Sequence, residues 1–296
     1  MDAFSTETRS DIPPGPTANK REKIHAVSTK NNQPDWDQIA EKFDVWLPHI
    51  APVGEALLAA LDAQPGDRIL DLASGTGEPA LTLARRLKGH ASITGIDAAD
   101  GMVRVAQAKA AKERLSGISF RCMPAEQLTF HDNSFDRVLC RFGVMLFTDP
   151  LQGLKEMRRV LKPGGRFALA VWSTPETIPT LRWSYEVFSK RLPETLHPPL
   201  AKATSLGAPG MLENLLSEAG FSGFSVASKT FDYQFRSFEE LWDTVEASDM
   251  LKQQYDALPQ NERGKIRDEV GRFARDFIHD GQLRIPHEYL VAAGGK

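Results

Sequence analysis

Apolar and polar positions alternate in two rhythms along the middle of the chain. Short apolar runs typical of strands are separated by longer stretches with the three- and four-residue apolar spacing of helices. The predicted strands lie at residues 68–72, 92–96, 118–121, 137–140 and 166–172, and the predicted helices begin at 79, 101 and 151. Such alternation is typical of a parallel sheet covered on both faces. The pattern predicts an α/β fold with a doubly wound, mostly parallel sheet.

The first predicted strand leads directly into a glycine turn and a helix. Asp71 interrupts an otherwise apolar run, residues 73–77 are small, and a helical pattern begins at Pro79. Glycine has no Cβ and tolerates positive φ, so Gly75 and Gly77 let backbone approach a ligand closely. The start of the following helix points free N–H groups toward the same place. We expect the rest of the chain to be organised around this ligand-binding turn.

The chain before this unit is predicted to contain a tail and a lid. Residues 1–32 are rich in proline and polar residues, which predicts a disordered tail. Residues 33–64 are predicted to form an N-terminal helical lid, with amphipathic helices over 36–46 and 53–63.

Three large aromatic residues fall on one face of the predicted first helix. They are Trp36, Phe43 and Trp46. This face either docks on the core or closes over a ligand, and the ligand hypothesis adds the three residues to the candidate substrate site.

The α/β core is predicted to span residues 65–173, and the rhythm changes after it. Strand-like alternation returns at 224–235 and again at 289–293. The predicted segments are a substrate-side insertion that returns to the sheet (174–236), a helical insertion (237–282) and the last strand of the core (283–296).

Composition narrows the classes of function. The 296 residues are 41% hydrophobic and carry a formal net charge of −3, so no general attraction to nucleic acid or anionic membrane is expected. No apolar run approaches a membrane span, and no secretory signal is visible, so we expect a soluble cytoplasmic protein. Cys122 and Cys140 lack metal-site spacing and are expected to be buried free thiols. No metal site is predicted, and the oligomeric state is left open.

Carboxylates near the turn bear on the kind of ligand. Asp97 ends the second strand about 20 residues after the turn, where a carboxylate can accept hydrogen bonds from a ribose diol. Gly75, Gly77 and Ala80 also fit a relaxed dinucleotide pattern. However, Asp71 and Glu78 on either side of the turn suit a ligand with an amino group better than a pyrophosphate.

Four successive motifs resemble those of class I S-adenosylmethionine-dependent methyltransferases, in the branch of the ubiquinone/menaquinone-biosynthesis C-methyltransferases and related small-molecule enzymes. The motifs are Asp71–Gly77, Gly95–Asp97, Pro124–Leu128 with Asn133–Asp136, and Arg158–Gly165. The resemblance covers about residues 65–173. It implies a Rossmann-like seven-stranded sheet with an antiparallel last strand, helical lid insertions, and S-adenosyl-L-methionine as cofactor.

The resemblance also implies roles for individual residues. Asp71, Ala73, Gly75 and Gly77 would surround the methionine part of the cofactor, with Asp71 near its ammonium group. Asp97 would hold the ribose hydroxyls. The residues expected at the adenine are Ala98, Met102, Ala125 and Glu126. Many relatives have Asp where this chain has Pro124, so the contact to the adenine amino group must come from another group.

Acceptor recognition is expected beyond the fourth and fifth strands. Arg141 could orient an anionic substrate, and His49 is the better candidate among the histidines for a general base, where one is needed. Met145 and Trp172 are candidate acceptor contacts, and core packing is the alternative for such residues. An apolar aromatic pocket suits a small hydrophobic or ring-bearing molecule. No basic stretch interleaved with aromatic residues indicates a nucleic-acid partner.

The sequence therefore favours an enzyme that transfers a methyl group to a small molecule by direct in-line attack. Two alternatives remain open at this point. One is a nicotinamide-dependent oxidoreductase, which the relaxed glycine pattern permits. The other is a non-catalytic cofactor-binding module with the same fold.

Overall fold

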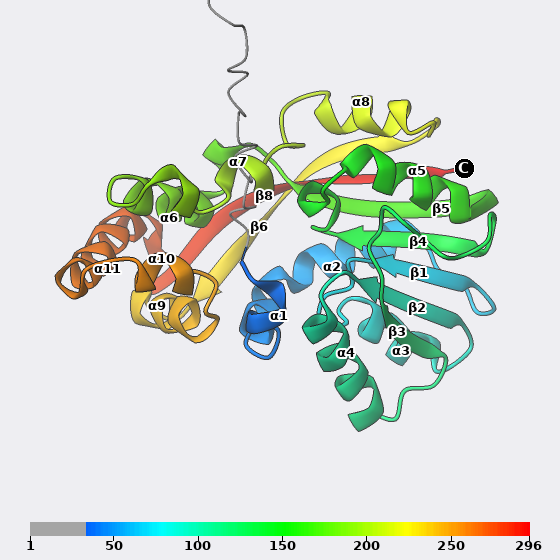
Figure 1. The fold of residues 1–296 in the computed structure, drawn as a ribbon, viewed down its shortest axis with the longest axis horizontal. Coiled ribbons are helices and arrows are strands. Elements are labelled where there is room, and N and C mark those ends of the chain that lie inside the picture. Colours follow the sequence, from blue (N-terminus) through cyan, green and yellow to red (C-terminus); the bar gives the residue numbers. More distant parts are fainter. Residues whose placement is uncertain (1–33) are drawn as a thin grey trace, which may run out of the picture. The chain divides into compact units, whose positions relative to one another are not determined.

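The computed structural model describes residues 34–296, so the predicted disordered tail at 1–32 lies outside the described part of the chain. One mixed sheet dominates these residues, with strand order β3-β2-β1-β4-β5-β8-β6 and the short β7 paired to β8 (Figure 1). The strands are β1 (Arg68–Leu72), β2 (Ser92–Asp97), β3 (Ile118–Cys122), β4 (Phe135–Arg141), β5 (Leu161–Trp172), β6 (Ser225–Phe235), β7 (Ile278–His279) and β8 (Gln282–Gly295).

The first five strands are parallel, and β8 is antiparallel to both of its long neighbours. The seven long strands confirm the expected Rossmann-like sheet with an antiparallel last strand. β1 lies between β2 and β4, with Asp71 beside Gly95 on one side and Leu139 on the other. The strand order reverses between β1 and β4, which is where open α/β sheets bind ligands.

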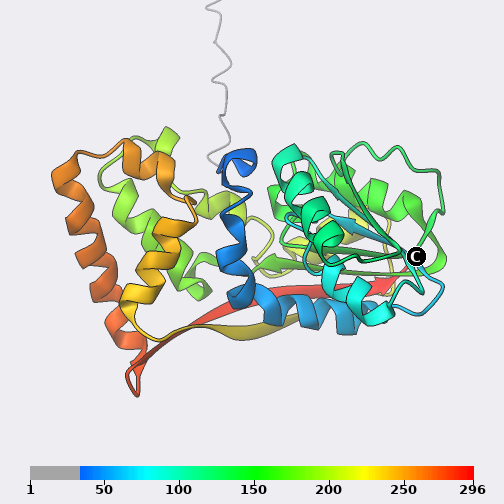
Figure 2. The same ribbon diagram turned by 90° about the horizontal axis from the view of Figure 1, so that it is seen from below.

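Helices cover both faces of the sheet, as the alternation predicted. α2, α3 and α4 lie on one face, and α5 and α8 on the other (Figures 1 and 2). The α-helices are α1 (Trp36–Ile39), α2 (Leu47–Leu61), α3 (Ala80–Leu87), α4 (Asp100–Lys112), α5 (Pro150–Val160), α6 (Pro179–Ser189), α7 (Leu200–Ala203), α8 (Met211–Glu218), α9 (Phe238–Ala247), α10 (Lys252–Asp256) and α11 (Gln260–Ala274). Five 3₁₀ turns complete the element order: η1 (Phe43–Trp46), η2 (Val144–Leu146), η3 (Pro175–Thr177), η4 (Glu194–Leu196) and η5 (Arg275–Phe277).

The hairpin of β6 and β8 reaches far beyond the rest of the sheet and carries the helical insertion α9–α11 between its strands (Figure 1). β8 extends beyond the short alternation at 289–293, because its pairing with β6 continues to Phe235 opposite Leu283. Alternate side chains of the added length, including Leu283 and Ile285, are buried. A second apolar cluster joins α6 to the insertion, with Val187, Phe188, Trp242, Leu258 and Ile266 at its centre.

The predicted continuous helix over 36–46 is wrong. α1 ends at Ile39, and the separate 3₁₀ turn η1 precedes α2, which begins at Leu47 rather than Val53. Pro48 fits the start of α2 at Leu47, because proline is favoured in the first turn of a helix and disfavours a helix that continues through it. The three aromatic residues of this segment therefore do not share one helical face.

Two smaller findings concern the cysteines and the helices. Both cysteines are free, but only Cys140 is buried, so the expectation for Cys122 is wrong. Cys122 ends β3, which lies at the edge of the sheet and has a neighbouring strand on one side only. Among residues 34–296, no helix is long and apolar enough to cross a membrane.

Candidate functional site

The turn after β1 contains one glycine with free space around it and one that is packed against neighbouring side chains. Ala73, Gly75 and Gly77 have φ values of +52°, +52° and +102°. A Cβ added at Gly77 would lie 2.7 Å from Leu81 Cδ1, whereas a Cβ added at Gly75 would meet nothing within 4 Å. The turn is thus fixed on the α3 side and presents bare backbone at Gly75.

Unpartnered polar groups lie at the same turn. Asp71 and Ser74 are buried, and neither the Asp71 carboxylate oxygens nor Ser74 Oγ has a hydrogen-bond partner. Burial is the main cause that raises the pKa of Asp71 to about 8, against the attraction of the Arg141 guanidinium. Buried polar atoms without partners are costly, so a ligand that supplies a cationic donor would stabilise them. The turn therefore fits the ammonium group of S-adenosylmethionine.

Asp97 lies opposite the turn, at the end of β2. Its Oδ2 accepts the Gly75 backbone N–H at 2.8 Å, and its Oδ1 accepts that of Ala99 at 2.9 Å. Burial raises the pKa of Asp97, and the N–H donors oppose this shift. Each carboxylate oxygen can accept a second hydrogen bond, so the carboxylate can hold a diol while it fixes the turn.

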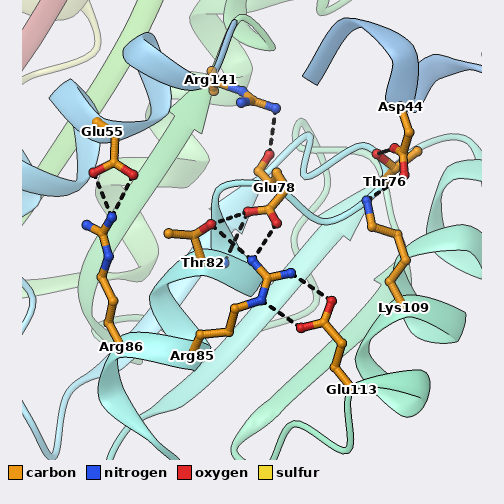
Figure 3. Close-up of polar contacts among 10 residues, drawn as sticks. All are labelled: Asp44, Glu55, Thr76, Glu78, Thr82, Arg85, Arg86, Lys109, Glu113 and Arg141. Atoms are coloured by element: carbon orange, nitrogen blue, oxygen red, sulfur yellow. Dashed lines mark hydrogen bonds and ion pairs between the residues drawn. The ribbon is translucent and has the colours of Figure 1, made fainter. Parts of the chain in front are cut away.

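Glu78 is already paired within the protein, whereas the sequence suggested that it faces a ligand amino group. Its side chain accepts hydrogen bonds from Thr82 N at 3.1 Å and Thr82 Oγ1 at 2.7 Å, and it pairs with Arg85 at 2.8 Å (Figure 3). The carboxylate therefore satisfies free donors at the start of α3 and is neutralised locally. Only Asp71, and not Glu78, is available to a cationic ligand.

The other residues expected at the cofactor lie around the start of α4 and the loop after β3. Ala98 follows Asp97 directly, and Met102 is buried against α1. Ala125 is buried. Glu126 Oε1 accepts the backbone N–H of Thr148 at 2.9 Å, so this oxygen already has a partner. These four contacts to adenine remain predictions.

Arg141 ends β4 beside the turn. Its guanidinium donates to the backbone oxygen of Glu78 at 2.8 Å (Figure 3). Burial lowers the pKa of Arg141, and the nearby carboxylates, first that of Asp71, oppose the shift. The next residue, Phe142, has a φ of +59°, which is rare for a bulky residue. Backbone in this region is over-represented at functional sites.

An aromatic cluster adjoins Arg141. The rings of Phe142 and Trp172 stack with centroids 4.0 Å apart, and Met145 Sδ accepts the Trp172 backbone N–H at 3.4 Å. Two further members, Tyr233 and His287, were not predicted from the sequence, and their rings stack 4.1 Å apart. The alternation over 224–235 could have indicated Tyr233, since it shares the buried face of β6 with Phe231 and Phe235.

The lid residues divide between the two sides of the site. Trp46 lies 5.9 Å from the Tyr233 ring, and His49 lies 5.8 Å from the same ring and 4.2 Å from Phe235, measured between centroids. Burial lowers the pKa of His49, which favours the neutral form that a base requires. Trp36 and Phe43 instead pack beside Met102, on the expected cofactor side.

Comparisons with known proteins agree with this geometry. A family model described as the ubiE/COQ5 methyltransferase family matches residues 38–204. The ubiquinone/menaquinone biosynthesis C-methyltransferase UbiE of Geotalea daltonii is 37% identical over 170 residues, which cover 53% of this chain and 72% of that protein. The demethylmenaquinone methyltransferase of Staphylococcus epidermidis is 30% identical over 71% of this chain and 90% of its own length.

Solved structures extend the similarity to the fold. The phosphoethanolamine N-methyltransferase 2 of Haemonchus contortus, in complex with S-adenosyl-L-methionine, has a TM-score of 0.57 and 19% identity, and the match covers 88% of this chain and 57% of that chain. At this identity the similarity concerns the fold alone. It agrees with the mixed sheet and flanking helices of this chain.

Proposed function

The chain belongs to the ubiE/COQ5 methyltransferase family, and we propose that its methyl acceptor is a hydroxyl-bearing apolar ring of the quinol type. The enzyme is an S-adenosylmethionine-dependent methyltransferase that acts on a small molecule. Relatives named for ubiquinone, menaquinone and demethylmenaquinone support the proposed ring. No observation favours a nicotinamide-dependent reaction or a non-catalytic role.

The observation that carries the proposal is that the Arg141 guanidinium bonds the ligand turn and interacts electrostatically with Tyr233 of the aromatic cluster. Arg141 bonds the turn at Glu78 O, and Phe142, the next residue, stacks on Trp172. An apolar wall next to a partly buried cation suits a flat ring that carries an oxygen. A nearby cation favours the anionic form of that oxygen, and a phenolate directs electron density to the ring carbons.

The chain's own residues then have simple tasks. Bound S-adenosylmethionine supplies a methyl group on a positively charged sulfur. Asp71 would hold the ammonium group of the cofactor, and Asp97 would hold its ribose hydroxyls. Arg141 would orient the acceptor oxygen. The aromatic side chains would exclude water from the line of attack. His49, in its neutral form, could accept a proton from the acceptor hydroxyl. When the ring carbon takes the methyl group, S-adenosylhomocysteine is the leaving group, and the hydrogen on that carbon is then lost as a proton to solvent, which restores the aromatic ring.

The region outside the family match is expected to decide which ring is accepted. The matched residues end at 204, whereas β6, β8 and α9–α11 follow it. Tyr233 and His287 of the aromatic cluster both come from this region. The proposal therefore concerns the chemical class of the acceptor and leaves its ring substituents to experiment.

A transfer assay with labelled cofactor tests this proposal. The acceptors are a reduced 1,4-naphthoquinone with an unsubstituted ring position, its oxidised form, and an aliphatic amine of similar size. We expect label on a ring carbon of the reduced compound, identified by mass spectrometry and NMR, and none on the oxidised form. Methylation of the amine, with none of the reduced ring, would overturn the proposed acceptor class.

A further inference from the structure

The N-terminal residues 34–46, here called the closing segment, are tied to the ligand turn by one carboxylate. Asp44 in η1 accepts a hydrogen bond from Thr76 Oγ1 at 2.5 Å through Oδ1, and its Oδ2 pairs with Lys109 Nζ of α4 at 2.8 Å (Figure 3). Asp44 thus bridges the turn after β1 and the helix after β2. These are the two elements expected to hold the two ends of the cofactor.

The groups that form this bridge are partly or fully shielded from water. Thr76 is 1% exposed and lies between Gly75 and Gly77, which both have positive φ. The Lys109 side chain is 22% exposed and that of Asp44 39%, so water screens their ion pair less than a pair on the open surface. A charge-assisted bond to Thr76 therefore adds a restraint on the turn from the closing segment.

The closing segment has a second attachment at the start of α4. Asp37 Oδ1 accepts the backbone N–H of Gly101 at 2.5 Å, and a Cβ on Gly101 would lie 2.7 Å from Asp37 O, so the backbones approach closely. Ile39 is buried against Met102. The segment therefore covers the stretch that contains Asp97 and Met102.

A third attachment joins the closing segment to the helical insertion. Lys42 Nζ pairs with Asp249, in the loop between α9 and α10, at 2.5 Å. The neighbouring Met250 packs into the cluster that contains Ile39 and Met102. Both ends of the segment are thus held, and Asp44 is the attachment that reaches the ligand turn itself.

We propose that Asp44 is a positioning residue that latches the closing segment onto Thr76, so that this bond must break before the cofactor product can leave. The proposal rests on the placement of the cofactor at this turn. Asp44 acts through Thr76 and has no chemical role in methyl transfer. Because the latch is separate from the groups expected to bind the cofactor, its loss changes how often the site opens rather than what it binds.

The test is the rate at which S-adenosylhomocysteine dissociates, followed by stopped-flow fluorescence of the tryptophans, two of which, Trp36 and Trp46, lie in the closing segment. We expect Asp44→Ala to speed dissociation on the order of 10-fold, the scale of one lost hydrogen bond to a charged group, without slower association. Thr76→Val should give a similar dissociation rate. The double variant, with both Asp44→Ala and Thr76→Val, should dissociate no faster than either single variant. Thr76→Ser, which keeps the hydroxyl, should return the wild-type rate.

A second measurement needs no ligand. Hydrogen exchange at the amides of Gly75, Thr76 and Gly77 should become faster in ligand-free Asp44→Ala and stay unchanged in Asp268→Ala, which alters an exposed carboxylate on α11. Asp44→Asn keeps a hydrogen-bond acceptor with the same shape and should show an intermediate effect, so it reports on the latch even where the alanine variant is unstable.

The outcomes separate the latch from the proposed function. Unchanged dissociation in both Asp44 variants, with normal wild-type binding, would overturn the latch and leave the methyltransferase site intact. Weaker binding that arises from slower association alone would also overturn it, because it indicates a damaged site. If the wild-type protein does not bind S-adenosylhomocysteine, both the placement of the cofactor at this turn and the latch are overturned.

Discussion

The Asp97 carboxylate holds the backbone of Gly75, with 2.8 Å between the amide nitrogen and Oδ2. This bond joins the end of β2 to the turn after β1 across the edge of the sheet where ligands bind in such folds. Asp97 therefore has two roles. It fixes the turn, and it offers further acceptor capacity to a ribose diol.

Replacement of Asp97 should weaken cofactor binding. We expect Asp97→Ala to reduce the affinity for S-adenosylhomocysteine by about 1–3 kcal/mol, since polar groups would be left without partners. Asp97→Asn keeps one of the two side-chain oxygens and should reduce the affinity by a smaller amount. Isothermal titration calorimetry measures both, with Asp268→Ala as the control for loss of an exposed carboxylate. Wild-type affinity in Asp97→Ala would show that the ribose is held elsewhere.

Asp71 should release a proton when the cofactor binds. With a pKa of about 8, the carboxyl of the free protein is mostly protonated at pH 7. A ligand ammonium favours the charged form and lowers that pKa, so binding at pH 7 should release about one proton, and affinity should rise between pH 6 and 8.

Calorimetry in buffers of different ionisation enthalpy counts this proton. The isosteric variant Asp71→Asn cannot ionise and should bind without proton release. Equal proton release by wild type and Asp71→Asn would assign the proton to another group and remove Asp71 from contact with the ammonium group.

Arg141 should set the pH dependence of acceptor use. The guanidinium is expected to lower the pKa of the acceptor hydroxyl, so Arg141→Gln should move the acidic limb of the kcat/KM profile upward by about one pH unit or more. The measurement is the pH–rate profile with a reduced naphthoquinone. Arg137→Gln, on the same strand but paired with Asp67, is the control. Identical profiles for wild type and Arg141→Gln would mean that Arg141 does not face the acceptor oxygen.

The loops after β1 and β4 should be sensitive to one added methyl group. A Cβ at Gly143 would lie 2.5 Å from Ala73 Cβ, so Gly143→Ala must push the loops apart and should reduce the free energy of unfolding by about 1–3 kcal/mol. Gly264 in α11 has no heavy atom within 4 Å of its Cβ position, so Gly264→Ala should stabilise by about 0.5–1 kcal/mol. Urea unfolding measures the free energy of unfolding of both variants. An unchanged value for Gly143→Ala would show that the two loops can move apart at little cost.

Local sequence pattern was enough for the core of the fold. β1, the glycine turn and the start of α3 were predicted nearly to the residue because apolar runs, small residues and proline all indicate the same boundaries. The alternation at 289–293 marks only part of β8, since the rest of the strand depends on pairing with β6, more than 40 residues away in the chain. Pairing between distant strands leaves little local signal.

Side-chain direction was harder to predict than position. Both Asp71 and Glu78 lie at the turn, yet only Asp71 is left without a partner, because Thr82 and Arg85 engage Glu78. Tyr233 and Trp46 meet although nearly 190 residues separate them. Such contacts follow from tertiary packing, and neither residue type nor spacing alone indicates them.

The most direct test of the account is a crystal structure of the protein with S-adenosylhomocysteine at saturating concentration. The account predicts the ligand on the turn after β1, with its ammonium group within hydrogen-bond distance of Asp71 and its ribose hydroxyls on Asp97. A ligand carboxylate next to Asp71, or a turn left empty while the ligand binds elsewhere, would contradict it.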